Sequence, residues 1–295
     1  MTDSLLHLKN QLYTGAYQTV INEAGNPQLL NSLSDLDKLH ARVLLNRTYL
    51  THGRFNLVIS DIKKSDPDVL IAVQLLAMYL ASPQTQSQVL QQTQNIIEQI
   101  SDPEPVLCVV LATILTLAGL YDDALRLVVK HPQDLECVGL AVQLYCLIQR
   151  PDIAEHEVSR MKKWADDATL AQIIETWVGI FKGGPEKYQE SFYVFDELTA
   201  SHLATSKLLS SKAVCLIHSN RFEDANNLLL ESLNKNPNDA DTLANLVVVN
   251  HFLQKPGSSI AQYLSQLQDV SPNHPLIKET AAKERLFDEC SQSYS

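Results

Sequence analysis

A short turn signal that recurs about every thirty-four residues limits the possible folds most strongly. A small residue, any residue and an aromatic residue stand together at four places: Gly15-Ala16-Tyr17, Gly53-Arg54-Phe55, Gly119-Leu120-Tyr121 and Asn220-Arg221-Phe222. Their spacings are one, two and three steps of this period, so further turns are expected near residues 86, 153 and 186. Each place has a helix-breaking stretch, at Ser82-Pro83-Gln84, Gln149-Arg150-Pro151-Asp152 and Gly183-Gly184-Pro185. A fixed period of this length is typical of repeat architectures.

Apolar stretches of helical length precede most of these turns. They are residues 70–80, 106–118, 135–148, 170–181, 206–219 and 240–253. After the turn at Asn220, the apolar residues Phe222, Ala225 and Leu229 follow helical spacing, and Pro237 ends the second helix. Nine glycines in 295 residues are few, which favours helices joined by short polar turns.

A helical hairpin of this length, with a small residue at position twenty and proline at position thirty-two, resembles the tetratricopeptide repeat. The best matches are residues 206–239, which have Ala213, Ala225 and Pro237 at positions eight, twenty and thirty-two, and 240–273. We therefore expect an all-α fold: one elongated, curved or ring-like α-solenoid over residues 1–295, of roughly eight hairpins, with a capping helix at about 275–290. The small turn residue should let the two helices pack closely. The turn aromatic should fill the gap between hairpins.

Charge and composition exclude several classes of function. The net charge of -11 and the lack of a basic run argue against nucleic-acid binding and against direct anchoring to an anionic membrane. The most apolar stretch, residues 106–120, is shorter than the roughly twenty residues of a membrane span. The N-terminus shows no signal-peptide pattern. Four of the five cysteines lie in apolar stretches predicted to be helical and are expected to be buried, reduced thiols: Cys108, Cys137, Cys146 and Cys215.

No catalytic or cofactor motif stands out. The sequence contains no phosphate-binding glycine loop and no nucleophile elbow, and His156-Glu157-Val158-Ser159-Arg160 lacks the second histidine of a zinc helix. We therefore predict no enzyme activity, no cofactor and no metal site. The match of Asn46-Arg47-Thr48 to the glycosylation pattern is expected to be chance, because it lies in a helix. Five aromatic residues are expected to serve in packing: Trp164, Trp177, Phe192, Tyr193 and Phe195.

The concave face of the solenoid is the predicted binding surface. In tetratricopeptide arrays, positions two, five, nine, twelve and thirteen of the first helices line this face. Here those positions are Val109, Thr113, Thr116, Leu147, Lys207, Ser210, Val214, Ile217, His218, Asp241, Ala244, Val248, His251 and Phe252. The largely apolar lining favours a permanent, hydrophobic partner. The alternative is that these side chains pack inside a tightly wound superhelix, and both interpretations stay open.

Several segments along the chain resemble the epsilon subunits of coatomer. They are Leu8-Lys9-Asn10 through Gln18, residues 167–198, Thr242-Leu243-Ala244-Asn245-Leu246, Lys255-Pro256, Tyr263 to Leu267, His274 to Glu279, Lys283-Glu284 and Phe287-Asp288. The resemblance implies a non-catalytic subunit of the COPI coat, one that curls around an extended segment of the C-terminal domain of the alpha subunit. It also implies a heterodimer with alpha, indirect contact with the remaining coatomer, and retrograde Golgi-to-ER and intra-Golgi transport.

The same resemblance implies a cytoplasmic protein, peripheral on the cytosolic face of Golgi membranes and coat vesicles through the coat. The alternative is a cytosolic tetratricopeptide adaptor of the co-chaperone type, which clamps an acidic peptide C-terminus. Such a clamp needs several cationic side chains on the concave face. Only Lys207 is suitably placed among the predicted lining residues.

Overall fold

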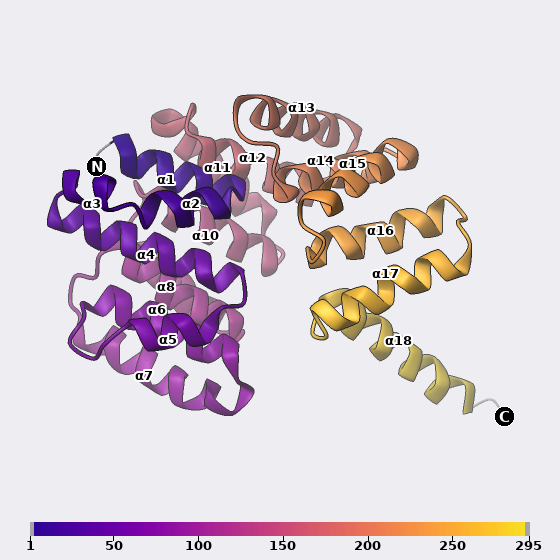
Figure 1. Ribbon diagram of the computed structural model, residues 1–295. Helices are drawn as coiled ribbons and strands as arrows, with labels where there is room; N and C mark the ends of the chain where they lie inside the picture. Colours follow the sequence, from indigo (N-terminus) through magenta and orange to yellow (C-terminus); the bar gives the residue numbers. More distant parts are fainter. Residues whose placement is uncertain (1–2, 293–295) are drawn as a thin grey trace. The chain divides into compact units, whose positions relative to one another are not determined.

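Helices joined by short turns make up residues 3–292, the part of the chain that the computed structural model describes (Figure 1). The predicted all-α architecture of stacked helical hairpins is confirmed. The chain divides into two compact units, unit 1 (Met1–Lys182) and unit 2 (Gly183–Ser295). That residues 1–295 behave as one solenoid stays a prediction.

Unit 1 consists of helical hairpins whose first helices pack side by side. Its helices are α1 (Asp3–Thr14), α2 (Tyr17–Ala24), α3 (Pro27–Ser32), α4 (Asp35–Thr51), α5 (Phe55–Asp61), α6 (Asp68–Ala81), the 3-10 helix η1 (Pro83–Thr85), α7 (Gln86–Gln99), α8 (Pro105–Leu117), α9 (Tyr121–Val128), α10 (Leu135–Leu147), α11 (Pro151–Ala165) and α12 (Thr169–Lys182). Along the unit, α4 packs on α6, α6 on α8, α8 on α10, and α10 on α12. Helix α1 contacts both α4 and α12, so unit 1 curls back onto its own N-terminal helix.

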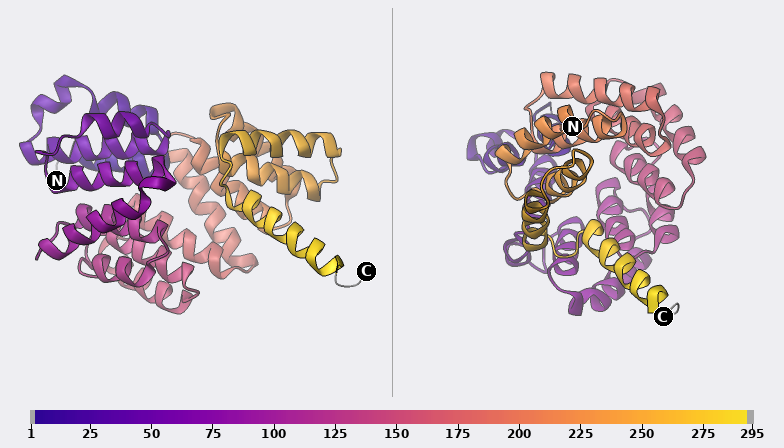
Figure 2. Two further views of the ribbon diagram at one scale, coloured as in Figure 1. Left: turned by 90° about the horizontal axis from the view of Figure 1, so that it is seen from below. Right: turned by 90° about the vertical axis from the view of Figure 1, so that its right-hand side faces the viewer.

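Unit 2 continues the hairpin pattern. Its helices are α13 (Pro185–Ser201), α14 (Ser206–His218), α15 (Phe222–Lys235), α16 (Ala240–Phe252), α17 (Gly257–Val270) and α18 (Pro275–Gln292). Each packs on the next from α13 to α17. Helix α18, predicted as a capping helix, has no buried residue among those described and joins the unit through the half-buried Leu276 and Ile277. Its C-terminal end projects away from α16 and α17 (Figures 1 and 2).

The predicted first helices agree closely with α6, α8, α10, α12, α14 and α16. One element is missing from the prediction. Helix α3, which the Asn26 side chain caps at its N-terminus, is inserted between the first and second hairpins. This insertion explains why the first two turns lie farther apart than the later ones. The four cysteines predicted to be buried are buried, and burial raises the pKa of the Cys215 thiol to about 12.

The small residue of each turn has a conformational role. Gly53, Gly119 and Asn220 adopt φ values of 67°, 78° and 59°, in the left-handed region. The following amide then bonds back into the helix, as Leu120 N–H does to Leu115 O at 2.9 Å. A Cβ atom at Gly53 or Gly119 would have no atom within 4 Å. The expectation that these residues allow close helix packing is therefore wrong, and backbone conformation is the reason for them.

Replacing Gly119 by alanine is expected to lower the free energy of unfolding by about 1 kcal/mol. The left-handed conformation costs a residue with a side chain about 1–2 kcal/mol, which the lower entropy of the unfolded alanine chain only partly offsets. Urea unfolding of both proteins measures the difference. The free energy of unfolding should fall less for Gly119→Asn, because asparagine tolerates the left-handed conformation. Equal decreases for the two variants would contradict the explanation.

The predicted gap-filling role of the turn aromatics is confirmed at two turns. Tyr17, at the start of α2, meets His52, at the end of α4, edge to face with ring centroids 5.5 Å apart. Phe222, at the start of α15, stacks on Phe252, at the end of α16, at 4.6 Å. In both cases, the aromatic side chain of one hairpin contacts the first helix of the next hairpin.

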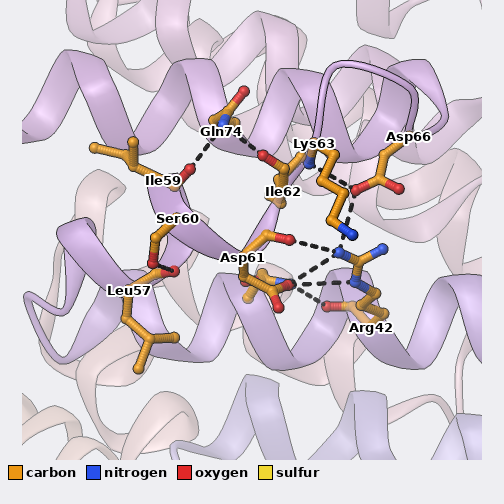
Figure 3. Close-up of polar contacts among 10 residues, drawn as sticks. Arg42, Leu57, Ile59, Ser60, Asp61, Ile62, Lys63, Asp66 and Gln74 are labelled. Carbon is orange, nitrogen blue, oxygen red and sulfur yellow. Dashed lines mark hydrogen bonds and ion pairs between the residues drawn. The ribbon is translucent and has the colours of Figure 1, made fainter.

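A polar cluster joins α4, α5 and α6 (Figure 3). The Gln74 side chain on α6 donates to the carbonyl oxygens of Ile59 and Ile62 at 2.8 and 2.9 Å, which satisfies carbonyls left open at the end of the short helix α5. The Arg42 guanidinium on α4 bonds the carboxylates of Asp61 and Asp66 at 3.1 and 3.2 Å. The Lys63 backbone N–H and then Arg42 hold the pKa of Asp66 below its usual value. These contacts link successive first helices through the loop after α5.

Candidate partner-binding surface

The first helices of unit 1 other than α6 share one cavity on their inner face. Four lining residues occupy position nine of their hairpins, six residues before a turn residue with positive φ: Arg47 on α4, Thr113 on α8, Gln143 on α10 and Trp177 on α12. The cavity has a volume of about 180 Å³. Its other lining residues are Tyr13, Val109, Glu136, Gly139, Leu140 and Leu170. We call this space the inner-face cavity.

A buried group of charges lies at the inner-face cavity and is called the charge cluster: Lys9, Tyr13, Arg47 and Glu136. The Arg47 Nη1 donates to Glu136 Oε2 at 2.6 Å, and the Tyr13 hydroxyl donates to Oε1 at 2.5 Å. Lys9 Nζ lies 3.9 Å from Oε1. The side chains of Glu136 and Lys9 are only 6% and 10% exposed. The cluster therefore links helices α1 and α4 to helix α10, although these helices are far apart in the sequence.

The charges of the cluster shift the pKa values of its acids in opposite directions. Burial alone raises the pKa of Glu136, but the positive charges of Arg47 and Lys9 and the hydrogen bonds from Tyr13 and Arg47 outweigh it. The pKa of Glu136 therefore lies below its usual value. Burial and the Glu136 charge both raise the pKa of Tyr13, so its hydroxyl stays a donor.

Acid should remove the stabilising contribution of Glu136. Because its pKa is lower in the folded than in the unfolded chain, the contribution is complete above the unfolded value of about 4.3 and is lost as pH falls through the folded pKa. We expect the difference in unfolding free energy between the wild type and Glu136→Gln to be constant from pH 7 to about 5 and to shrink below about pH 4.3. Urea unfolding at each pH measures it. A difference that grows on acidification would contradict this assignment.

A row of large apolar side chains lies at position thirteen, at the ends of the first helices of unit 1. We call it the apolar ladder: Leu80 on α6, Leu117 on α8, Leu147 on α10 and Phe181 on α12. They are 40%, 50%, 52% and 42% exposed, respectively. Because these four helices pack each on the next, the side chains stand on neighbouring helices. Of the four, only Leu147 was predicted from the sequence. Reading position thirteen in every hairpin finds the other three.

The predicted lining residues of unit 1 take different places on this face. Val109 is buried and Thr113 half-buried, and both line the inner-face cavity. The half-buried Thr116 bonds back to Ala112 O at 2.7 Å. Leu147 is exposed and belongs to the apolar ladder.

In unit 2, the predicted lining residues divide by exposure. Ser210 and Ala244 are buried. The Asn245 amide on α16 donates to the Ser210 hydroxyl on α14 at 3.3 Å, and Ala244 packs in a core cluster with Leu267 on α17. The half-buried residues are Val214, Ile217 and Val248, and the exposed residues are Lys207, His218, Asp241, His251 and Phe252. The His218 ring stacks on Tyr188 with centroids 4.7 Å apart.

Of the aromatic residues expected in packing, two are exposed. Trp164 is 42% exposed and Tyr193 59%, so for these two the expectation is wrong. The buried stripe of α11 includes Ala154, Val158 and Met161, spaced so that Trp164 falls beside it. Phe195 is buried, while Phe192 and Trp177 are half-buried against core residues. Asn46 is also buried, and its side-chain amide donates to Arg42 O at 3.0 Å, as the chance interpretation of the glycosylation pattern requires.

The inner face of unit 1 offers charge, hydrogen-bonding groups and apolar area. Within residues 3–292, no three His, Cys, Asp or Glu side chains are placed to share a metal ion. Over the same residues, no helix combines the length and apolar character that a membrane span needs. A cavity that contains charged groups, beside a row of apolar side chains, is a combination suited to holding another protein.

Comparison with known proteins gives end-to-end sequence matches. The family model of the coatomer epsilon subunit matches residues 1–295. Coatomer subunit epsilon-1 of Arabidopsis thaliana is 35% identical over 99% of the chain and 98% of the relative. The epsilon subunit of Dictyostelium discoideum is 34% identical over 97% of each, and that of Caenorhabditis elegans 28% identical over 98% of the chain and 97% of the relative.

Solved structures show similarity in fold alone. A tetratricopeptide repeat protein from Parabacteroides merdae gives a TM-score of 0.60 at 14% identity, covering 90% of this chain and 97% of its own. The Cut9–Hcn1 hetero-tetramer of the APC/C gives a TM-score of 0.57 at 15% identity, covering 83% of this chain and 49% of the matched chain. Both agree with the tetratricopeptide-like hairpins inferred from the turn period.

Proposed function

We propose, because the chain belongs to the coatomer epsilon subunit family, that it binds and stabilises the C-terminal domain of the alpha subunit. Members of this family are non-catalytic subunits of the COPI coat. The family match over residues 1–295 is the observation that carries the proposal. In this role the protein forms a heterodimer with alpha and reaches the other coatomer subunits through it. It acts in Golgi-to-ER retrograde and intra-Golgi transport, in the cytoplasm and on the cytosolic face of Golgi membranes and vesicles through the coat.

We place the main contact on the inner face of unit 1. The apolar ladder supplies half-exposed leucine and phenylalanine side chains, and burying such side chains against a partner is the main source of interface stability. The inner-face cavity beside it supplies polar groups that orient the partner. In unit 2, the exposed Phe252 and His218 and the half-buried Val214, Ile217 and Val248 form a second contact surface.

Co-expression with the alpha C-terminal domain tests the proposal. At micromolar concentration the two chains should elute together from a sizing column, with the mass of a one-to-one complex. Circular dichroism of the isolated protein checks that it is helical and folded. Separate elution of two folded proteins would contradict the proposal.

A further inference from the structure

We propose that the inner-face cavity of unit 1 binds a carboxylate of the alpha partner together with the apolar group next to it. This inference rests on the proposed function and adds the chemistry that the partner must present. It concerns one anchoring residue of the partner within the larger apolar contact.

Arg47 and Gln143 leave hydrogen-bonding groups open at the cavity: those of Arg47 are donors, and the Gln143 amide can both donate and accept. Arg47 uses only Nη1 on Glu136, so its Nε and Nη2 make no hydrogen bond to the described chain. Its side chain is 21% exposed at the cavity. The exposed amide of Gln143 also has no hydrogen-bond partner within residues 3–292. By contrast, the Tyr13 hydroxyl donates to Glu136 and the Thr113 hydroxyl to Val109 O at 2.7 Å. A ligand group that accepts hydrogen bonds fits this arrangement.

The charges of the cluster and of its nearest carboxylate neighbour balance. Lys9 and Arg47 are two cations, and Glu136 is the carboxylate that contacts both. Asp134, a further carboxylate whose charge acts on Arg47, caps α10 by accepting from Cys137 N–H at 3.0 Å. Both oxygens of Glu136 already accept hydrogen bonds within the cluster. An incoming anion can therefore form charge-assisted bonds to Arg47, which are stronger than neutral ones in a partly enclosed site.

The remaining wall of the cavity is apolar. Val109, Leu140, Leu170 and Trp177 line the same cavity as Arg47. The cavity has a volume of about 180 Å³. This leaves room for a carboxylate and a short apolar side chain. The ligand class is thus a chain-terminal carboxylate, or an Asp or Glu side chain, beside an apolar residue.

Removing the open donors should weaken alpha binding. Arg47→Gln is expected to raise the dissociation constant about 10- to 100-fold, the usual worth of a hydrogen bond to a charged group. Gln143→Leu should raise the dissociation constant about fivefold. Because Gln143 is exposed and lies outside the charge cluster, this variant keeps the test valid if Arg47→Gln folds poorly. Arg126→Gln, a matched change of charge on the outer helix α9, should leave the dissociation constant unchanged. Calorimetric titration with the alpha C-terminal domain measures all three.

Two further arms identify the anion and its position. Amidating the C-terminus of the alpha domain tests the terminal carboxylate, and Asp→Asn and Glu→Gln changes in that domain test side-chain carboxylates. One of these changes in the alpha domain should weaken the complex by as much as Arg47→Gln does. In protein labelled with 5-fluorotryptophan, with Trp164→Phe assigning the two signals, alpha binding should shift the Trp177 ¹⁹F resonance.

The outcomes separate this inference from the proposed function. If the wild type does not bind the alpha domain, both the inference and the proposed function are contradicted. If it binds, but folded Arg47→Gln and Gln143→Leu bind within threefold of it and the Trp177 resonance does not move, the inference alone is overturned. It is likewise overturned if no carboxylate change in alpha weakens the complex.

Discussion

Replacing Leu117 and Leu147 together by aspartate is expected to weaken binding of the alpha C-terminal domain at least a hundredfold while unit 1 stays folded. Both side chains belong to the apolar ladder and are about half exposed, at 50% and 52%, so the free protein tolerates the change. In a complex, each buried leucine contributes about 1.5–3 kcal/mol, and an aspartate in its place must also be desolvated. A combined loss above about 3 kcal/mol corresponds to more than a hundredfold in the dissociation constant.

A matched variant separates the ladder from general surface effects. Leu57 is 43% exposed on α5, a second helix, so Leu57→Asp makes the same chemical change away from the inner face. Calorimetric titration should show wild-type affinity for Leu57→Asp and the large loss for the double variant. Circular dichroism should show equal helix content in all three proteins. Binding of the folded double variant within threefold of the wild type would place the interface elsewhere.

Replacing Glu136 by alanine is expected to lower the free energy of unfolding by about 3–5 kcal/mol. The change leaves Lys9 and Arg47 as buried cations without their carboxylate, and breaking a buried ion pair on one side has this order of cost. Tyr13 loses its acceptor as well. Urea unfolding followed by circular dichroism measures the loss. Limited proteolysis should show α1 released first, because Lys9 and Tyr13 attach it to α10.

A double-mutant cycle tests whether the pairing causes this loss. Arg47→Met removes the cation that makes the shortest contact to Glu136, so the double variant Glu136→Ala/Arg47→Met should be destabilised by less than the sum of the two single variants. The expected difference is at least about 1.5 kcal/mol. Additive effects, or a Glu136→Ala variant within about 1 kcal/mol of the wild type, would contradict the role of the charge cluster.

The hairpin architecture could be predicted because its causes are local in sequence. Turn residues such as Gly119 and Asn220 end helices through their own backbone conformation, and proline at position 151 or 185 begins the next helix. These signals recur at a fixed period, so the first helices are recognisable even in degenerate repeats. The role of the small turn residues could not be predicted, because the sequence does not show whether lack of space or a positive φ angle restricts the choice of residue at a position.

The candidate site was only partly predictable because its contacts are far apart in sequence. Glu136 meets Lys9 and Arg47 only because unit 1 curls back on α1, and that curl depends on how successive helices pack. The fourteen predicted lining residues mix exposed ones such as Leu147 with packed ones such as Ser210, since one residue can face the concave surface and still lie under a neighbouring helix.

Site-specific photo-crosslinking tests most directly whether the inner face of unit 1 holds the alpha subunit. A benzophenone-bearing amino acid replaces Leu117 on α8 in one protein and Leu57 on α5 in another. After irradiation with the alpha C-terminal domain, we expect efficient crosslinking from position 117 and little from position 57. Equal crosslinking from both, or crosslinking from position 57 alone, would contradict an inner-face interface.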